Sequence, residues 1–347
     1  MSHTFRELLR KIGSGPHTGE NLTRSEAEAA TRMMLLQEAT PAQIGAFMIA
    51  HRIKRPTGEE LAGMLDAYDG LCDRLQPIPA NHPVLVLCSP YDGRSRTAPF
   101  SVLTALVLAA AEVPVVLHGG DRMPTKEGVP LVELWASLGV DWRSCTLEQV
   151  QRVLQTQGIG FFYLPNHFPL AEALVPYRDQ IGKRPPFSTL ELMWSPYVGE
   201  QQLVCGFVHP PTENMFRTAF ELRGTLNFTT VKGLEGSCDL PRDRTAIIGL
   251  NQASGFERLH LTPRDYGFAA KEVALMPTDA WSDLAKMTIQ GHTTELTDSL
   301  IWNSGFYLWR SGVVQELPMG LELAKTLLTQ GNVAQVWHNL QGTVGIG

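Results

Sequence analysis

Two loops in this 347-residue chain combine glycines with cationic side chains, and each follows an apolar, strand-like run. The first loop, after the run 84–88, contains Asp92-Gly93-Arg94-Ser95-Arg96. The second, after the run 113–117, begins with His118-Gly119 and continues to Thr125-Lys126-Glu127-Gly128. Glycine lets a main chain approach a ligand closely, and guanidinium and ammonium groups bind phosphate oxygens well. The two loops together predict an anion site whose expected ligand is a phosphate.

The elements around these loops indicate how the loops would meet. A helical run of small apolar residues, 103–111, separates the two strand-like runs, which is the pattern of a βαβ unit. The strands of such a unit are parallel, so both loops leave the same edge of the sheet. Taken alone, residues 92–96 are also compatible with a solvated surface turn, and residues 118–128 with a glycine-rich turn that carries an incidental lysine.

The overall composition disfavours several classes of protein. A formal net charge of −6 disfavours a globally basic nucleic-acid binder, although a local basic cleft stays open. The five cysteines are scattered without a CxxC pair, which makes a zinc site unexpected and indicates reduced thiols in a cytoplasm. The N-terminus lacks a signal-like pattern, and no apolar run has membrane-spanning length. We therefore expect a cytoplasmic protein with no membrane contact.

The first 75 residues have the pattern of a helical domain. Thr23, Thr40 and Thr57 each begin a capping box ahead of a helical run, which makes three helix starts at regular intervals. The proline-rich segment 76–83 is expected to link this domain to an α/β domain over 84–347. Within the second domain we expect further strands at 160–164, 203–208, 226–231 and 245–250, and helices at 150–157, 170–181, 320–329 and 333–340.

Several stretches resemble the anthranilate phosphoribosyltransferase family. The helical start carries "LLRKIGSG" and "LTRSEAEAA", the loops "SPYDG", "PTKEG", "LPNHFP" and "VPYRDQIGKR" follow the family's motif order, and "GLELAKTLLTQGNV" resembles its closing helix. The resemblance implies a two-domain fold of the nucleoside phosphorylase and phosphoribosyltransferase type, with the ligand cleft between the domains. It also implies transfer of phosphoribosyl from phosphoribosyl pyrophosphate to an aromatic amine such as anthranilate, as in tryptophan biosynthesis, by a homodimer that packs through its N-terminal helices.

The same resemblance assigns roles to individual residues. Arg178 matches the arginine that faces the carboxylate of the aromatic acid, although a surface arginine paired with a nearby acid is an alternative. Glu235 matches one carboxylate of the family's magnesium pair, and Asp239 is the candidate to replace the other, which is Gly236 here. The expected donor-binding residues are Asp92, Gly93, Arg94, His118, Gly119, Thr125, Lys126 and Gly128, and the expected acceptor-binding residues are Asn166, His167, Arg178 and Arg184.

The donor loop departs from the family pattern. The family reads GTGGDG where this chain has Cys88 to Gly93, so Asp92 and Gly93 alone match the end of the motif. This departure, with the loss of one magnesium carboxylate, resembles the divergent, YbiB-like branch, which includes nucleic-acid binders without the standard activity. Two alternatives therefore stay open: a non-enzymatic paralogue that binds nucleic acid in the same cationic cleft, and a transferase or phosphorylase that acts on another nitrogenous acceptor.

Overall fold

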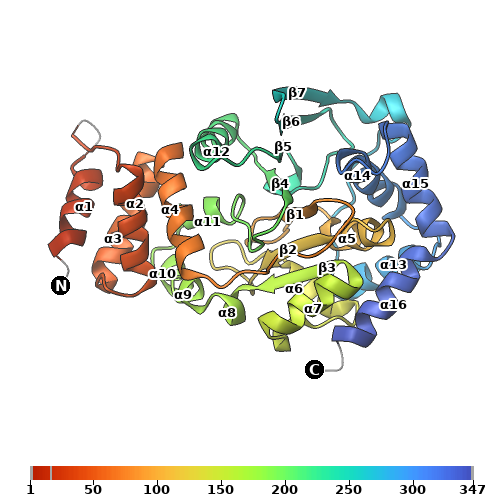
Figure 1. Cartoon of the computed structure of the whole chain (residues 1–347), viewed down its shortest axis with the longest axis horizontal. Helices are drawn as coiled ribbons and strands as arrows, with labels where there is room; N and C mark the ends of the chain where they lie inside the picture. Colours follow the sequence, from red (N-terminus) through yellow and green to blue (C-terminus); the bar gives the residue numbers. More distant parts are fainter. Residues whose placement is uncertain (1–2, 16–17, 345–347) are drawn as a thin grey trace.

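The computed structural model describes residues 3–15 and 18–344, and its N-terminal part is a bundle of four helices (Figure 1). Three of these helices begin at the expected threonines, where the hydroxyl of Thr23, Thr40 or Thr57 accepts a hydrogen bond from the backbone N–H three residues later. The capping boxes are confirmed because each depends on residues only three positions apart. The helices are α1 (His3–Gly13), α2 (Arg24–Leu35), α3 (Pro41–Lys54) and α4 (Gly58–Leu71).

The rest of the described chain is built around a seven-stranded sheet with the order β3-β2-β1-β4-β5-β6-β7. The first five strands in this order are parallel, and β6 and β7 are antiparallel additions at one edge. Every residue of β1, β2 and β3 is buried, as expected for parallel strands covered on both faces. The strands are β1 (Val84–Cys88), β2 (Val115–Gly119), β3 (Ile159–Tyr163), β4 (Gln201–Gly206), β5 (Phe228–Val231), β6 (Ala246–Gln252) and β7 (Gly255–Leu261).

Helices surround this sheet and also bridge it to the N-terminal bundle. Helix α5 packs against α14, α15 and α16, which lie at the end of the molecule opposite to α1 (Figure 1). Helices α10 and α11 instead contact α3 and α4, so they join the two parts of the chain. The helices are α5 (Ser101–Ala110), α6 (Leu131–Ser137), α7 (Leu147–Gln157), α8 (Leu164–His167), α9 (Pro169–Glu172), α10 (Val175–Gln180), α11 (Phe187–Leu190), α12 (Pro210–Arg223), α13 (Thr278–Ile289), α14 (Thr297–Arg310), α15 (Leu317–Thr329) and α16 (Asn332–Val344).

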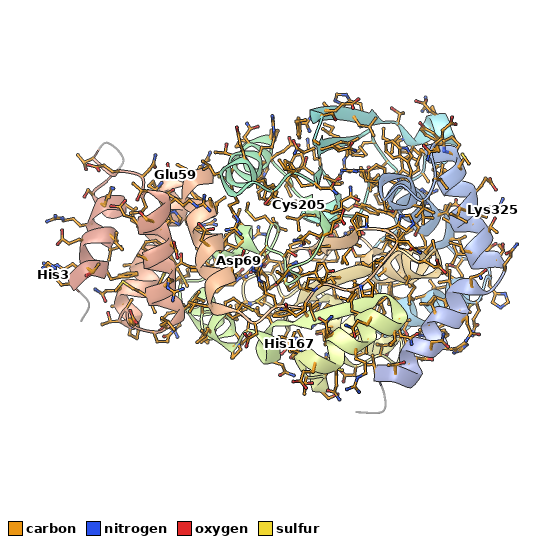
Figure 2. All side chains as sticks on the ribbon, in the orientation of Figure 1. His3, Glu59, Asp69, His167, Cys205 and Lys325 are labelled. Atoms are coloured by element: carbon orange, nitrogen blue, oxygen red, sulfur yellow. The ribbon has the colours of Figure 1, made fainter. Side chains whose placement is uncertain are left out.

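Ion pairs connect helix α4 of the N-terminal bundle to helix α12 of the α/β part. Arg223 of α12 contacts Asp66 and also lies 2.6 Å from an oxygen of Asp69, and both carboxylates belong to α4. Asp69 also accepts a hydrogen bond from the Trp194 indole N–H at 3.1 Å. Figure 2 shows Asp69 on the inner side of the bundle, toward the sheet. These contacts keep α4 and the aromatic residues beside it at a defined distance from the strand ends.

The expected elements need several corrections. Strand β2 begins at Val115 and includes His118 and Gly119, so these two residues do not open the second loop. The expected helix 170–181 is two short helices, because prolines at the first turns of α9 and α10 begin each one anew. Strand β7 and helices α6, α8, α11, α12, α13 and α14 were not expected at all. None of the helices in the described part of the chain is long and apolar enough to span a membrane.

Candidate functional site

The two glycine-containing loops pair with each other at the carboxyl ends of β1 and β2. The Arg94 N–H donates to the Val129 carbonyl at 3.1 Å, the Val129 N–H donates to the Arg94 carbonyl at 2.8 Å, and the Gly128 N–H donates to the Asp92 carbonyl at 3.1 Å. Gly93 has a φ of +67°, and a Cβ on it would lie 2.5 Å from the Val129 carbonyl oxygen. A Cβ on Gly128 would lie 2.5 Å from the Asp92 carbonyl oxygen. Both glycines are therefore needed for the contact between the loops, and no ligand has to be invoked for them.

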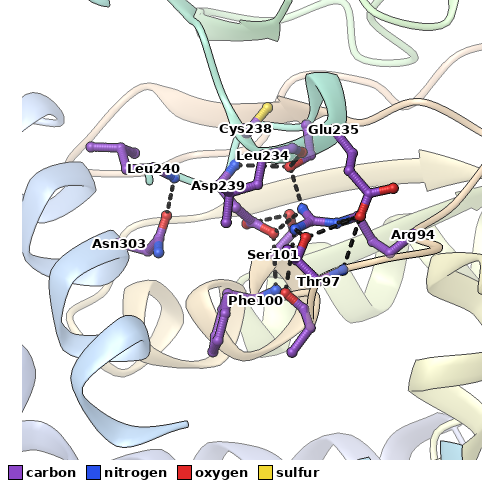
Figure 3. Close-up of polar contacts among 12 residues, drawn as sticks. Arg94, Thr97, Phe100, Ser101, Leu234, Glu235, Cys238, Asp239, Leu240 and Asn303 are labelled. Atoms are coloured by element: carbon purple, nitrogen blue, oxygen red, sulfur yellow. Dashed lines mark hydrogen bonds and ion pairs between the residues drawn. The ribbon is translucent and has the colours of Figure 1, made fainter. Parts of the chain in front are cut away.

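Arg94 is a buried ion-pair centre. Its side chain is 3% exposed, and its Nη1 donates to Ser237 Oγ at 2.6 Å and to Asp239 Oδ2 at 2.9 Å (Figure 3). Asp239 also accepts from the Phe100 N–H and from the Ser101 hydroxyl, each at 3.0 Å. These two donors lie at the start of α5, so Asp239 caps that helix from the loop after β5. The same carboxylate was expected to be a metal ligand.

Glu235 occupies a ring of donors in the first loop. Its carboxylate accepts hydrogen bonds from the backbone N–H groups of Ser95, Arg96 and Thr97 and from the hydroxyls of Ser95 and Thr97, all at 3.0–3.1 Å. Lys126 Nζ lies 3.1 Å from Glu235 Oε2 and donates to the Gly93 carbonyl at 2.7 Å. We call residues 95–97 together with Lys126 the anion cradle. The donors that were predicted to hold an anion are thus occupied by a carboxylate of the chain itself.

The electrostatics of Glu235 follow from these neighbours. Burial by itself would raise the pKa of Glu235, but the charges of Arg94 and Lys126 and the surrounding hydrogen bonds outweigh burial and hold the pKa below its usual range. Glu235 is thus ionised and saturated with donors, and Asp239 is bonded to Arg94 and to the start of α5. In this arrangement the two carboxylates do not fit a magnesium ion. Over residues 3–15 and 18–344, no group of three or more His, Cys, Asp or Glu is placed to hold a metal.

A second ion-pair cluster lies beside the first and contains Arg178. This guanidinium contacts Asp92 and lies 2.9 Å from Glu191 Oε1, and its side chain is 3% exposed. Arg184, which is 55% exposed, reaches the other oxygen of Asp92 at 3.1 Å. Burial and the neighbouring Asp92 carboxylate raise the pKa of Glu191 to about 7, although Arg178 opposes this shift. The buried Asp92 and the largely buried Glu191, whose side chain is 11% exposed, thus share one buried arginine.

A narrow apolar cavity of about 30 Å³ lies beside Arg178 and Glu191. Its walls include Tyr68 from the N-terminal bundle and Tyr91 and Trp194 from the α/β part. A mostly apolar lining with a few polar groups is typical of small-molecule sites, and planar side chains favour a planar ligand, but this cavity must widen before such a ligand enters. The cavity lies between the two parts of the chain, where the sequence led us to expect the ligand cleft.

Other candidate residues make structural contacts outside the cradle, and they do not line the cavity themselves. His118 is buried in β2, where its Nδ1 lies 2.5 Å from the Tyr91 hydroxyl and burial lowers its pKa to about 3. His167 accepts from the Tyr163 N–H at 3.0 Å through Nδ1, and its Nε2 lies 2.9 Å from the Cys145 carbonyl, which gives it a structural role (Figure 2). The exposed Asn166 donates to the Arg143 carbonyl. Gly119 is a strand residue under Phe161, and Thr125 is exposed with a φ of +82°.

The structure also adds residues that sequence reasoning missed. Glu191, Tyr91 and Ser237 all contact the predicted arginines or their partners. Glu191 stands between Leu190 and Leu192, and a single acid in an apolar stretch is a signal that could have drawn attention to it. The structure thus collects Arg94, Arg96 and Lys126 around Glu235, and it collects Arg178 and Arg184 around Asp92.

The family of this chain follows from two matches that agree with this architecture. The helical bundle domain of a glycosyl transferase family matches residues 6–70, and the a/b domain of a glycosyl transferase family matches residues 93–334. The chain belongs to this glycosyl transferase family. Among its relatives, the anthranilate phosphoribosyltransferase of Symbiobacterium thermophilum is 27% identical over 341 residues, 97% of each chain. That of Afipia carboxidovorans is 29% identical over 334 residues, 95% of this chain and 96% of the relative.

Solved structures share the fold of this glycosyl transferase family member. The anthranilate phosphoribosyltransferase of Thermus thermophilus superposes with a TM-score of 0.77 at 21% identity, over 99% of this chain and all of that chain. The enzyme of Saccharomyces cerevisiae in complex with phosphoribosyl pyrophosphate and magnesium gives a TM-score of 0.84 at 15% identity, over all of this chain and 99% of that chain. The two-domain fold expected from the sequence is therefore confirmed.

Proposed function

We propose that this chain is a phosphoribosyltransferase that transfers phosphoribosyl from phosphoribosyl pyrophosphate to an aromatic amine of the anthranilate type. The observation that carries the proposal is the pair of adjoining compartments at one edge of the sheet. The anion cradle suits the phosphate groups of the donor, and the aromatic lining of the cavity suits a planar acceptor once the cavity widens. The loop Asp92–Arg94 borders both compartments, because Asp92 contacts Arg178 and Arg94 contacts Glu235.

The proposed reaction needs positioning more than covalent help. The amine nitrogen forms a bond to C1 of the ribose, the bond from C1 to the pyrophosphate oxygen breaks, and the leaving pyrophosphate takes the electron pair while the amine loses a proton. Lys126 and the backbone N–H groups of residues 95–97 would hold the charge of the donor, and Arg178 would orient the acceptor. Fixed charges and donors of this kind supply most of the rate in such a displacement.

We propose Mg²⁺ as the companion ion of the donor. The yeast enzyme of the same fold has been solved in complex with phosphoribosyl pyrophosphate and magnesium. Magnesium in proteins commonly binds to substrate phosphates and to only one or two carboxylates. A site assembled on the bound donor is consistent with the finding that the described part of the chain has no group of three or more His, Cys, Asp or Glu placed to hold a metal.

The direct test is calorimetry followed by a turnover assay. Phosphoribosyl pyrophosphate is titrated with and without Mg²⁺, and release of pyrophosphate is then measured with anthranilate as acceptor. We expect saturable donor binding and pyrophosphate release that depends on the amine. Absence of donor binding under both conditions would contradict the proposed function.

Replacement of Lys126 by alanine should weaken donor binding by about 10- to 150-fold, the usual range for loss of one charge-assisted hydrogen bond. Lys126 Nζ is placed by the Gly93 carbonyl at 2.7 Å, so its charge is aimed into the cradle. The matched control is Lys183→Ala, because Lys183 is exposed in the turn after α10. Equal donor affinity in Lys126→Ala and Lys183→Ala, measured by calorimetry, would remove Lys126 from the donor site.

Nucleic-acid binding is the second candidate, as it is for the divergent, YbiB-like branch that the altered donor loop resembles. Arg96 and Arg184 offer exposed charge, with side chains 78% and 55% exposed. Arg94, Lys126 and Arg178 are instead paired with carboxylates of the chain, which leaves less charge for a polyanion. Titration of single-stranded DNA over a series of salt concentrations separates the two functions, because a nucleic-acid binder loses affinity steeply with salt.

We also propose a homodimer that packs through the N-terminal helices. An open apolar groove on this part includes Ile12 from α1, Ile49 and Ile53 from α3, and Ile181. Ile53 is 76% exposed at this groove, and apolar surface grouped in this way marks interaction sites. Ile53→Glu should weaken the dimer by about 10-fold or more, because a charge would have to lose its water at the interface. Sedimentation analysis tests this, with Leu226→Glu as the control at an exposed apolar residue elsewhere.

Two further expectations stay proposals. We propose that residues 1–75, 76–83 and 84–347 are the helical domain, the linker and the phosphoribosyl-binding domain, of which residues 1–2, 16–17 and 345–347 lie outside the described residues. We also propose a cytoplasmic location. All five cysteines are free thiols, and Cys88, Cys145, Cys205 and Cys238 are buried, as expected in a reducing compartment.

A further inference from the structure

The anion cradle holds more donors than a carboxylate can use. Six donor atoms of residues 95–97 and Lys126 lie within 3.1 Å of the two Glu235 oxygens, and Arg94 Nε approaches one of them at 3.4 Å. An ionised carboxylate offers about four lone-pair sites. The cradle is therefore better matched to a group with more oxygens and more negative charge. A phosphate or pyrophosphate group has both properties.

The backbone on both sides of this contact is held in an unfavourable conformation. Glu235 has a φ of +54°, in the left-handed region that non-glycine residues rarely adopt. Thr125 and Glu127, which flank Lys126, have φ values of +82° and +51°. Such conformations persist only where surrounding contacts hold them, and they concentrate at sites that bind or switch. The contact between Glu235 and Lys126 thus joins two strained loops.

We propose that Glu235 is an internal competitor for the anion cradle, whose carboxylate must leave when the phosphate group of a pyrophosphate-type ligand binds. The proposal rests on the proposed donor site and adds that the site is closed by the chain itself when it is empty. While a carboxylate occupies the site, the ligand can bind only to the fraction of molecules in which the site is open. The apparent affinity is therefore the intrinsic affinity multiplied by that fraction. The Glu235 loop is then the element that opens the site.

The proposal predicts that loss of the Glu235 charge strengthens pyrophosphate binding. If Glu235 were a metal ligand or a structural clamp, the same change would not strengthen it. In the absence of Mg²⁺, Glu235→Gln should bind inorganic pyrophosphate at least about 10-fold more tightly than the unaltered chain, because a neutral amide competes poorly for the cradle. If Glu235 only clamped the loop in place, the same change would weaken pyrophosphate binding. Calorimetry with inorganic pyrophosphate in metal-free buffer distinguishes the two. Equal or weaker binding by a folded Glu235→Gln protein would overturn the proposal.

The matched control is Glu127→Gln, which removes one negative charge from an exposed position next to Lys126. Its pyrophosphate affinity should change by less than about 2-fold, because an exposed charge in water interacts weakly with the site. A gain in Glu127→Gln equal to that in Glu235→Gln would mean that net charge alone sets the affinity. That result would also overturn the proposal.

Hydrogen exchange on the unaltered chain provides a measurement that does not depend on folding of a variant. The Leu234 N–H donates to the Asp239 carbonyl at 2.9 Å, and the Ser237 N–H donates to the Leu234 carbonyl at 3.1 Å. Release of Glu235 should loosen this loop, so peptides covering 232–240 should exchange faster when pyrophosphate is added, while residues 95–97 stay protected. Unchanged or slower exchange in 232–240 would contradict release of Glu235. Turnover is assayed separately, so failure of the proposed reaction leaves this result interpretable.

Discussion

Replacement of Arg94 by alanine should lower the free energy of unfolding by about 3–5 kcal/mol, the range observed when one partner of a buried ion pair is removed. The reason is that Asp239 and Glu235, whose side chains are each 3% exposed, would lose the cation that both contact. Asp239 also caps α5, so loss of its partner Arg94 would also destabilise the start of that helix. Urea denaturation followed by tryptophan fluorescence measures the loss.

The control for this variant is Arg96→Ala in the same loop. Arg96 is 78% exposed and lies 3.8 Å from Glu235, so its removal should cost no more than about 1 kcal/mol. Similar losses of unfolding free energy in Arg94→Ala and Arg96→Ala would show that the strength of the Arg94 ion pairs does not depend on their burial. A loss below about 1 kcal/mol in Arg94→Ala would contradict the arrangement described for the cradle.

Replacement of Arg178 by alanine should also cost about 3–5 kcal/mol at pH 8, because it leaves Asp92 and Glu191 buried without their shared cation. Arg184→Ala is the matched control. It removes a second contact to the same Asp92 from a side chain that is 55% exposed, and it should cost no more than about 1 kcal/mol. Urea denaturation of both variants against the unaltered chain provides the comparison.

The loss in Arg178→Ala should depend on pH in a defined direction. The pKa of Glu191 is raised to about 7 in the folded chain, above its ordinary value of 4.5, so the folded state keeps a proton that the unfolded state releases between these values. The contribution of Glu191 to stability therefore falls as pH rises from about 4.5 to about 7 and is constant above that range. Without Arg178 the pKa rises further, which extends the fall above pH 7.

The destabilisation by Arg178→Ala should accordingly be smaller at pH 6 than at pH 8, with a slope of at most about 1.4 kcal/mol per pH unit for one proton. The buried His118 contributes a pH dependence of the opposite sign, but it is present in both proteins and cancels in their difference. Glu191→Gln in the Arg178→Ala background should recover part of the stability at pH 8. A loss that is independent of pH, with no recovery by Glu191→Gln, would exclude Glu191 as the titrating partner.

Much of the fold could be predicted because its signals are local. The capping boxes at Thr23, Thr40, Thr57 and Thr146 involve side chains and N–H groups three residues apart, so the sequence shows both partners together. The buried runs of β1 and β3 are visible as apolar strings of strand length. Helix α12 and strand β7 escaped prediction because their burial comes from partners elsewhere, such as α4 and β6.

For the candidate site, the sequence by itself determined which residues would gather at the edge of the sheet. Arg94, Lys126, Arg178 and Glu235 all follow parallel strands, and the carboxyl ends of parallel strands share one edge. Their charge and the flanking glycines were enough to indicate an anion site. His118 was misplaced because two residues at the end of β2 read equally well as strand or loop.

Only the tertiary structure decided how these charges are used. The contacts between Glu235 and residues 95–97 span 138–140 positions of the chain, and that between Arg178 and Asp92 spans 86. Pairing at such separations depends on how the loops pack against one another, which no local pattern records. Ionic interactions also depend steeply on distance and burial, so small differences in loop position determine whether a cation is free or paired. The residue types therefore predicted an anion site, and the packing of the loops filled it with a carboxylate of the same chain.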